Sequence, residues 1–211
     1  MAESYSIGEE DVMVVIDAQR DFCPGGALPV PNGDEVIGPI NRLMSVFKHT
    51  VLSQDWHPEG HQSFASTHAG KQPMETVDAP YGEQILWPDH AVAGTEGAEF
   101  HPDLDTSKVE LVVRKGFRPE IDSYSTFFEN DRKTTTGLAG YLKQRGLKRV
   151  FLVGLATEYC VGFSALDGVA EGFEVFVISD ATGSFGNEAT EPMCEEMDRA
   201  GVKRIKSSDL S

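Results

Sequence analysis

The sequence predicts an α/β fold of three layers, in which a parallel sheet lies between two layers of helices. Two observations lead to this prediction. Five or six short runs of apolar, often β-branched residues recur along the chain, without the alternation of polar residues typical of a strand exposed on one face. Segments with apolar residues at helical spacing separate several of these runs, which is the pattern of a parallel sheet covered on both faces.

The expected strands and helices follow from these runs. Strands are expected at residues 12–16, 50–53, 109–113, 150–153, 174–178 and 202–205. Helices are expected at residues 33–48, 138–145 and about 188–200, and another should begin near Thr157. Residues 18–32 should form a loop because they include the sequence Pro-Gly-Gly and two further prolines. With neither an internal repeat nor a linker, residues 1–211 should form a single domain.

Residues 56–107 form the longest stretch without helical or strand periodicity, and they are rich in Pro, Gly, His and Asp. So long a segment without regular elements is uncommon inside a compact domain and is usually functional. We therefore expect an extended loop over about residues 56–108 that contributes to a metal site. A shorter segment, residues 122–130, is polar and aromatic and should also be irregular.

The composition disfavours several classes of partner. The chain has 34 acidic and 18 basic residues, a net charge of −16, which disfavours nucleic acids and anionic membranes. No stretch approaches the roughly 20 apolar residues of a membrane span, and the acidic N-terminal segment is unlike a secretory signal. Three cysteines, Cys23, Cys160 and Cys194, are too few and odd in number for a disulfide framework. These features predict a reduced, cytoplasmic protein.

Residues 149–166 combine a buried strand, a turn and the start of a helix around one cysteine. If Thr157 is the N-cap, Cys160 is the third residue of the helix, where amide N–H groups lack intrahelical partners and the helix dipole is positive. A thiol there should have a lowered pKa, and the free amides could hold the oxyanion of a tetrahedral intermediate. The alternative is that Cys160 is a buried small hydrophobic residue without a chemical role.

Polar features follow four of the expected strands, namely Asp17, Asp55, Lys115 and the turn at 156–160. In an open parallel sheet, ligands bind beyond the carboxyl ends of the strands, where the strand order reverses. Asp17 beside a thiol could act as a general base, and a cation such as Lys115 could keep it ionised. Each of these residues alone could be a solvated loop charge, but the four together favour a site.

A metal site is indicated by one carboxylate and several imidazoles. Asp55 and His57 are two residues apart, so in an extended segment their side chains point the same way and can meet one ion. His61 and His90 lie further along the same segment. One carboxylate with two or three imidazoles suits Zn²⁺, Fe²⁺ or Mn²⁺ with positions left open for water or substrate. Each histidine taken alone is more often a surface residue.

Six short motifs, in this order along the chain, resemble those of the isochorismatase-like cysteine hydrolases, in particular their amide-hydrolysing branch, the nicotinamidases. They are VIDAQRDF at 15–22, SQDWHPEGHQSF at 53–64, WPDH at 87–90, RKG at 114–116, DSYS at 122–125 and GLATEYCV at 154–161. Any one motif is weak evidence. The six together cover most of the chain, from residue 12 to about 185, and are a strong signal.

The resemblance implies a six-stranded parallel sheet and a catalytic triad of Asp17, Lys115 and Cys160. It also implies an oxyanion hole made by the backbone amides of Ala156 and Cys160, with a cis peptide bond between Leu155 and Ala156. The resemblance further implies a divalent metal ion bound by Asp55, His57 and His90, for which Zn²⁺ is expected in preference to Fe²⁺ or Mn²⁺. The histidine at the position of His61 is a ligand in only some members of the family.

For the substrate, the resemblance implies hydrolysis of nicotinamide to nicotinate and ammonia in NAD salvage, with action on pyrazinamide as well. Phe22 and Trp87 match the aromatic walls around the pyridine ring, and Tyr124 and Tyr159 are further expected substrate-binding residues. Tyr159 departs from the histidine that some relatives carry, which bears on the selectivity of the pocket. A homo-oligomer is compatible with the sequence.

Three alternatives remain at this point. A metal-free relative could hydrolyse N-carbamoyl or other small amides with the same triad and would not need Asp55, His57 and His90. A non-enzymatic metal-binding protein on this fold would have no use for Cys160 beside Asp17 and Lys115. A thiol-redox protein fits less well, since no second cysteine lies within a turn of Cys160.

Overall fold

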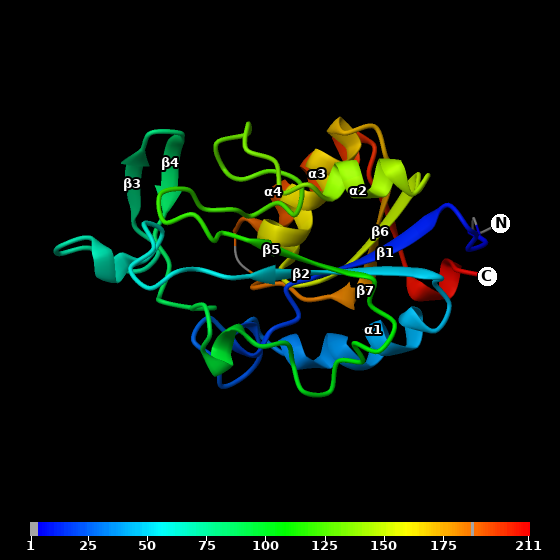
Figure 1. Ribbon diagram of the computed structural model, residues 1–211, viewed down its shortest axis with the longest axis horizontal. Coiled ribbons are helices and arrows are strands. Elements are labelled where there is room, and N and C mark those ends of the chain that lie inside the picture. Colours follow the sequence, from blue (N-terminus) through cyan, green and yellow to red (C-terminus); the bar gives the residue numbers. More distant parts are fainter. Residues whose placement is uncertain (1–3, 187) are drawn as a thin grey trace.

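A parallel sheet forms the centre of the computed structural model, which describes residues 4–186 and 188–211. Within these residues the sheet has six strands: β1 (Asp11–Ile16), β2 (His49–Asp55), β5 (Leu111–Lys115), β6 (Arg149–Gly154), β7 (Glu174–Thr182) and β8 (Lys203–Ile205). They lie in the order β5-β2-β1-β6-β7-β8, and every neighbouring pair is parallel (Figure 1). The predicted fold class and number of strands are confirmed.

Helices cover both faces of the sheet (Figure 1). Helix α1 (Ile37–Met44) lies on one face, and α2 (Leu138–Gln144), α3 (Gly162–Ala170) and α4 (Thr190–Ala200) lie on the other. The predicted three-layer arrangement is therefore confirmed. No helix in the described ranges is long and apolar enough to cross a membrane.

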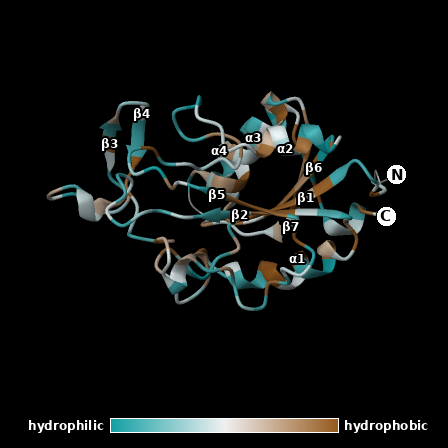
Figure 2. Cartoon of the chain, viewed as in Figure 1, coloured by the Kyte–Doolittle hydropathy of each residue, from teal (hydrophilic) through white to brown (hydrophobic). Residues whose placement is uncertain are grey.

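Alternate residues of the strands face the two helical layers. On β1, Met13 and Val15 belong to the core that includes α1, whereas Val12, Val14 and Ile16 belong to the core beneath α2, α3 and α4. Every residue of β1 is buried, which explains why its sequence shows no alternation. Figure 2 shows the same arrangement as hydrophobic strands at the centre of the molecule, with hydrophilic residues concentrated toward the periphery.

Residues 56–107, predicted to lack regular elements, contain a β-hairpin, so this prediction was wrong. Strands β3 (Thr76–Ala79) and β4 (Gly82–Ile85) pair antiparallel at the end of the molecule opposite the two termini (Figure 1). Seven of their eight residues are at least partly exposed, and polar residues interrupt the apolar ones, so the unbroken apolar runs that predicted the other strands are absent. Short 3-10 turns at Ala65–Thr67 and Glu96–Ala98 add further regular structure.

The helix predicted at 33–48 is shorter than expected. Gly33–Val36 is a 3-10 turn, α1 begins at Ile37, and it ends at Met44. Beyond α1 the amide of Val46 donates to the carbonyl of Leu43, only three residues back, at 2.8 Å. Phe47 continued the apolar pattern because it is buried against Phe151, with ring centroids 5.0 Å apart, although it lies outside the helix.

The sheet has one switch point, which lies between β1 and β6. From β1 the chain adds β2 and β5 on one side, and later adds β6, β7 and β8 on the other. Strands β2 and β5 both end two residues later than predicted, and β5 also begins two residues later. Asp55 and Lys115 are therefore their last residues and lie opposite each other in register. The carboxyl ends of β5, β2, β1 and β6 are therefore neighbours, which is where ligands bind in such sheets.

Candidate active site

Three residues of the predicted triad meet at the switch point. Asp17 follows β1, Lys115 ends β5, and Cys160 lies in the turn after β6. The Nζ of Lys115 lies 2.8 Å from Oδ2 of Asp17 and 3.4 Å from Sγ of Cys160. A carboxylate oxygen of Asp17 is within 4.8 Å of that sulfur. All three side chains are buried, so a thiol, a carboxylate and an ammonium share one desolvated space.

Lys115 is completely enclosed by acceptors. Besides Asp17 and Cys160, its ammonium lies 2.7 Å from Oδ1 of Asp55 and donates to the carbonyl oxygen of Ser123 at 2.9 Å. Burial lowers the pKa of Lys115, but the carboxylates of Asp17 and Asp55 outweigh burial and raise that pKa well above its usual value. Lys115 therefore remains a cation in the interior.

Ser53 holds the carboxylate of Asp17 from the side opposite Lys115. Its hydroxyl donates to Oδ1 of Asp17 at 2.6 Å and accepts the Asp17 amide N–H at 3.1 Å. Asp17 itself has a positive φ of 45°, which is uncommon outside glycine. With one oxygen bonded to Ser53 and the other paired with Lys115, the Asp17 carboxylate has a single orientation beside Cys160.

The predicted lowering of the Cys160 pKa was wrong. Burial raises the pKa of the Cys160 thiol well above its usual value; Lys115 opposes this shift, while the carboxylates of Asp17 and Asp55 add to it. Burial likewise raises the pKa of Asp17, although Lys115 opposes the change. The thiol is therefore protonated at rest and needs a base to become a nucleophile, and Asp17 is the adjacent candidate.

The turn that carries Cys160 also differs from the prediction. Thr157 is not an N-cap: Ala156 is, and the Thr157 hydroxyl donates to the carbonyl of Gly183 at 2.9 Å instead. Residues Thr157–Val161 form a π-helical turn in which Cys160 is the fourth residue, followed directly by α3. The expected cis peptide bond between Leu155 and Ala156 is present.

The backbone amides around this turn differ in their partners. Thr157 donates its backbone N–H to Gly183, and Val161 donates to Ala156. In the part of the chain that the structure describes, the N–H groups of Ala156 and Cys160 have no backbone acceptor outside their own helical turn. Both residues line the pocket, which makes their amides the candidates for holding an oxyanion.

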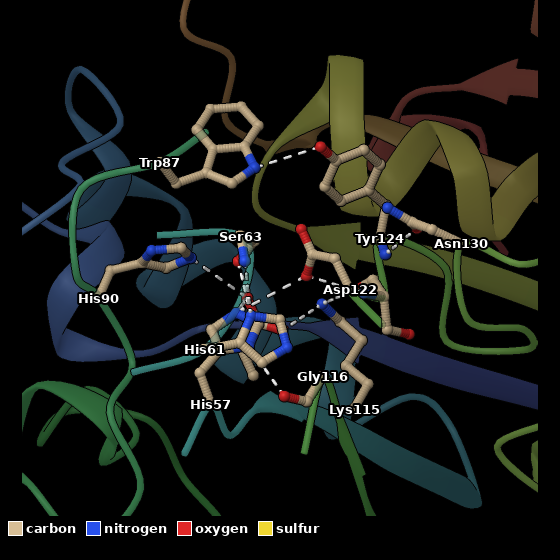
Figure 3. Close-up of polar contacts among 12 residues, drawn as sticks. His57, His61, Ser63, Trp87, His90, Lys115, Gly116, Asp122, Tyr124 and Asn130 are labelled. Atoms are coloured by element: carbon tan, nitrogen blue, oxygen red, sulfur yellow. Dashed lines mark hydrogen bonds and ion pairs between the residues drawn. The ribbon is translucent and has the colours of Figure 1, made fainter. Parts of the chain in front are cut away.

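A second group of donors adjoins the first through Asp55, and Figure 3 shows its histidines. Oδ2 of Asp55 lies 3.3 Å from Nε2 of His57 and 3.6 Å from Nε2 of His90. All three residues are buried, and their donor atoms lie within 4.8 Å of one another. The expected ligand set is thus brought together, with β2 supplying Asp55 and the following segment supplying both histidines.

The tautomers of the two histidines indicate that this group needs a cation. Nδ1 of His57 lies 2.9 Å from the carbonyl oxygen of Gly116, and Nδ1 of His90 lies 2.7 Å from that of Pro88. Because a carbonyl only accepts, each Nδ1 carries the hydrogen and each neutral Nε2 presents a lone pair. Two lone pairs facing a carboxylate repel unless a proton or a metal ion lies between them. One carboxylate and two imidazoles fit a divalent ion with positions left open.

Burial lowers the pKa of His57, but the carboxylate of Asp55 outweighs burial and raises that pKa. The direction agrees with a positive charge being favoured at this place.

His61, the uncertain ligand, lies beside the group but has other partners. Its Nδ1 lies 2.8 Å from Oγ of Ser63, and its Nε2 lies 2.9 Å from the carbonyl oxygen of Arg118. The ring packs on His57 with centroids 4.4 Å apart (Figure 3). Ligation by His61 would therefore require the nitrogen that binds the ion to give up its present hydrogen bond.

The four predicted substrate-binding aromatics line one pocket with Cys160, and the pocket encloses about 400 Å³ including its open mouth. Trp87 and Tyr159 meet edge to face with centroids 4.9 Å apart, and Tyr124 lies 6.1 Å from Trp87 and 5.8 Å from Tyr159. Phe22 lies on His90, at 5.5 Å. A pocket with aromatic walls and a few polar groups is suited to an aromatic ligand.

Sequence reasoning missed several residues of the site. Asp122 lines the pocket with Oδ1 3.9 Å from Nε2 of His57, and Phe185 lines it on the side of Tyr159. Gln19 holds the end of β2, accepting the amide of Asp55 at 2.7 Å and donating to its carbonyl at 2.8 Å. Gln19 lies three residues after the end of β1, and Asp122 begins the motif DSYS, so these positions were the available signals.

The fold and site define a hydrolase of the three-layer α/β class, with a buried cysteine, lysine and aspartate beside a candidate metal centre. The chain belongs to the isochorismatase family, because the Isochorismatase domain matches residues 11–209. Within that family it groups with the nicotinamidases, as the following relatives indicate.

The nicotinamidase of Acinetobacter baylyi is 48% identical over 199 residues, which cover 94% of this chain and 93% of the relative. The structure of PnC1 from L. infantum in complex with nicotinate is 38% identical, with a TM-score of 0.87, and the match covers 99% of this chain and 98% of the other. The structure of a Pyrococcus horikoshii pyrazinamidase in complex with zinc is 39% identical, with a TM-score of 0.76, covering 93% and 99%.

Proposed function

We propose that this protein is a metal-dependent cysteine amidohydrolase that converts nicotinamide to nicotinate and ammonia. The observation that carries the proposal is the contact of Lys115 with both Asp17 and Cys160, at 2.8 and 3.4 Å, beneath a pocket with aromatic walls. A buried thiol with an adjacent carboxylate suits acyl transfer, and the aromatic pocket suits a pyridine ring.

The relatives support the choice of substrate. A protein 48% identical to this chain is named a nicotinamidase, and a structure 38% identical holds nicotinate, the proposed product. A third relative is named a pyrazinamidase, so we include pyrazinamide, whose ring places a nitrogen in the same relation to the carboxamide. In a cell, nicotinate formed in this way would enter NAD salvage, for which we expect a cytoplasmic location.

The reaction begins with proton transfer from Cys160 to Asp17. The thiolate sulfur then attacks the carboxamide carbon, and the carbonyl oxygen becomes an oxyanion that the amides of Ala156 and Cys160 hold. Lys115 remains a cation throughout and balances the negative charge as it moves from Asp17 to the sulfur and back. Ser53 keeps the Asp17 carboxylate oriented for both transfers.

Collapse of the tetrahedral intermediate breaks the C–N bond. Asp17 returns its proton to the leaving nitrogen, so that ammonia departs and a thioester remains on Cys160. Asp17, ionised again, takes a proton from water, whose oxygen attacks the thioester carbon. Loss of the sulfur yields nicotinic acid, which ionises to nicotinate by releasing a proton to solvent, and the proton on Asp17 restores the thiol.

Asp55, His57 and His90 would hold the divalent ion, for which we propose zinc because a relative 39% identical was solved with zinc. When bound, the ion would coordinate the ring nitrogen of the substrate and so orient the carboxamide toward Cys160. The chain's own contribution is to fix the donors: Gly116 and Pro88 accept the Nδ1–H groups and keep both Nε2 atoms directed inward.

An ammonia-release assay on nicotinamide, with metal content measured on the same preparation, tests this function. We expect turnover of nicotinamide and pyrazinamide and about one bound divalent ion per chain. Turnover of N-carbamoyl amides by a metal-free protein, without turnover of nicotinamide, would instead favour the metal-free relative. Metal binding without hydrolysis of any amide would favour a binding protein.

A further inference from the structure

The hairpin that the sequence did not predict sends one buried side chain into the wall of the pocket. Gln84, on β4, is only 1% exposed although both neighbouring strand residues are at least partly exposed. Its amide contacts five groups, and four of them belong to other segments or to the turn of the hairpin: Tyr81, Asp122, Tyr124 and Asn130. A buried amide with this many partners fixes the relative positions of the segments it joins.

The chemistry of its partners determines how the Gln84 amide is oriented. Its nitrogen lies 2.7 Å from the carbonyl oxygen of Ile85 and 3.0 Å from Oδ2 of Asp122, and both of these atoms only accept. Its oxygen accepts from the hydroxyl of Tyr81 at 3.1 Å and from the amide of Asn130 at 3.3 Å. The –NH₂ group therefore faces the pocket side, and its two hydrogens serve three acceptors. The hydroxyl of Tyr124, the most distant of the three at 3.2 Å, shares one of these hydrogens.

Tyr124 thus receives hydrogen bonds from two groups that can only donate. The indole Nε1–H of Trp87 reaches its oxygen at 3.2 Å, and the Gln84 –NH₂ reaches it at the same distance (Figure 3 shows Trp87 and Tyr124). These two bonds use both lone pairs of the phenol oxygen. Within the described ranges of the chain, the Tyr124 hydroxyl makes no hydrogen bond as a donor.

We propose that Gln84 is a positioning residue that, together with Trp87, makes Tyr124 a hydrogen-bond donor to the substrate. With its lone pairs occupied, the phenol can only present its O–H to a further group, and Tyr124 lines the same pocket as Cys160. The substrate must therefore place an acceptor against Tyr124. Because the ring nitrogen is assigned to the metal ion, this acceptor is the carboxamide oxygen. This inference rests on the proposed hydrolysis of aromatic amides.

A positioning role of Gln84 and a role in stabilising the hairpin predict different kinetic effects when Gln84 is replaced. Loss of a donor to bound substrate weakens binding in the ground state and in the transition state alike, so it raises KM and leaves kcat nearly unchanged. A hairpin that unfolds partly would instead lower the fraction of active enzyme, which lowers kcat at constant KM. The two roles are thus distinguishable by kinetics.

The test compares Gln84→Met, Tyr124→Phe and the double variant on nicotinamide. We expect each single variant to raise KM about tenfold, the effect of one lost hydrogen bond, with kcat close to the wild-type value. The KM of the double variant should exceed that of Tyr124→Phe by no more than about twofold, because both changes remove the same hydrogen bond to the substrate.

Glu83→Met is the matched control, because Glu83 is an exposed neighbour in the same strand, and this change should leave KM unchanged. Multiplicative losses in the double variant, or an unchanged KM in Gln84→Met, would overturn the proposal.

A spectroscopic readout makes the test independent of activity. The chain has two tryptophans, so the indole N–H region of a ¹H–¹⁵N spectrum should contain two signals, which Trp87→Phe assigns. If Gln84 holds Tyr124, Gln84→Met should shift the Trp87 signal and leave that of Trp56, which lies under Arg114, in place. An unmoved Trp87 signal would overturn the positioning role. Absence of nicotinamide turnover in the wild type would refute the proposed function alone, with the Trp87 signal still deciding the role of Gln84.

Discussion

Nζ of Lys115 lies 2.7 Å from Oδ1 of Asp55, and this ion pair joins the candidate catalytic group to the candidate metal group. The other oxygen of Asp55 faces His57 and His90, and the same ammonium contacts Asp17 and Cys160. Buried charges of opposite sign are costly to separate, because removal of one partner leaves the other unpaired. A change at Lys115 should therefore affect both groups.

We expect Asp17→Asn and Lys115→Ala each to reduce kcat by a factor on the order of 10²–10⁴. Asparagine keeps the shape of Asp17 but cannot take the thiol proton, and without Lys115 two buried carboxylates face each other without a cation. Because both residues act in one step, the double variant should be little worse than the poorer single variant.

Steady-state kinetics on nicotinamide measure these effects, and metal content measured in parallel separates the two residues. Lys115→Ala should also change metal binding, since Asp55 loses its partner, whereas Asp17→Asn should not. Activity within a few-fold of wild type in either variant would remove that residue from the mechanism.

Cys160→Ala should abolish turnover and still bind nicotinate. The pocket walls and the metal donors do not depend on the sulfur, so calorimetric affinity for nicotinate should stay close to that of the wild type. Cys194→Ala, which changes a cysteine outside the pocket, is the control and should keep full activity. Substantial residual turnover in Cys160→Ala would exclude it as the nucleophile.

The sheet was predictable from the sequence because its strands are buried on both faces and read as unbroken apolar runs, as in residues 12–16. The β3–β4 hairpin was not predictable in this way, because its strands are only four residues long, mostly exposed at least in part, and contain no unbroken apolar run. Its anchoring to the rest of the molecule includes the hydrogen bonds of Gln84 to Asp122, Tyr124 and Asn130, more than 35 positions away in the sequence. The periodicity of a short sequence segment does not predict contacts between residues so far apart in the chain.

At the site, the residues at strand ends could be predicted from the sequence. The hydrogen bond of Thr157 and the direction of the pKa shift of Cys160 could not. Asp17, Asp55 and Lys115 each follow or end an apolar run, so their convergence follows from parallel topology. The prediction that Thr157 is the N-cap was wrong because its hydroxyl donates to the carbonyl oxygen of Gly183, 26 positions later in the sequence. The predicted lowering of the Cys160 pKa was wrong because burial, which depends on the whole fold, outweighs the local effect of the helix start.

Benzamide should be hydrolysed at least ~10²-fold less efficiently than nicotinamide, because it has a C–H where nicotinamide has its ring nitrogen, and a site built around one polar contact rejects an analogue that lacks it. His57→Ala should lower nicotinamide hydrolysis severely and shrink the gap between the two amides, since one of the metal donors is gone. The measurement is kcat/KM for both amides with metal content checked in each protein. Equal efficiency on both amides in the wild type would contradict a metal-bound ring nitrogen.

The backbone at Gly116 supports the ring of His57. Gly116 has a φ of +65°, and a Cβ built on it would lie 2.4 Å from Cε1 and 2.6 Å from Nδ1 of His57. His57 is buried, and its Nδ1 is bonded to the carbonyl of Gly116 itself, so the ring has little room to yield. Gly116→Ala should therefore displace this donor and weaken metal binding about 10–100-fold, the usual effect of disturbing the support of a ligand.

Gly146→Ala is a control matched in backbone conformation, since Gly146 has a φ of +73° and nothing lies within 4 Å of a Cβ there. Both substitutions place alanine in the left-handed region and should lose similar stability, on the order of 1 kcal/mol, from that strain. Only Gly116→Ala should also lose bound metal, measured by titration with Zn²⁺, and nicotinamide turnover. Equal metal affinity in the two variants would mean that His57 tolerates displacement and that its fixed position is not what holds the ion.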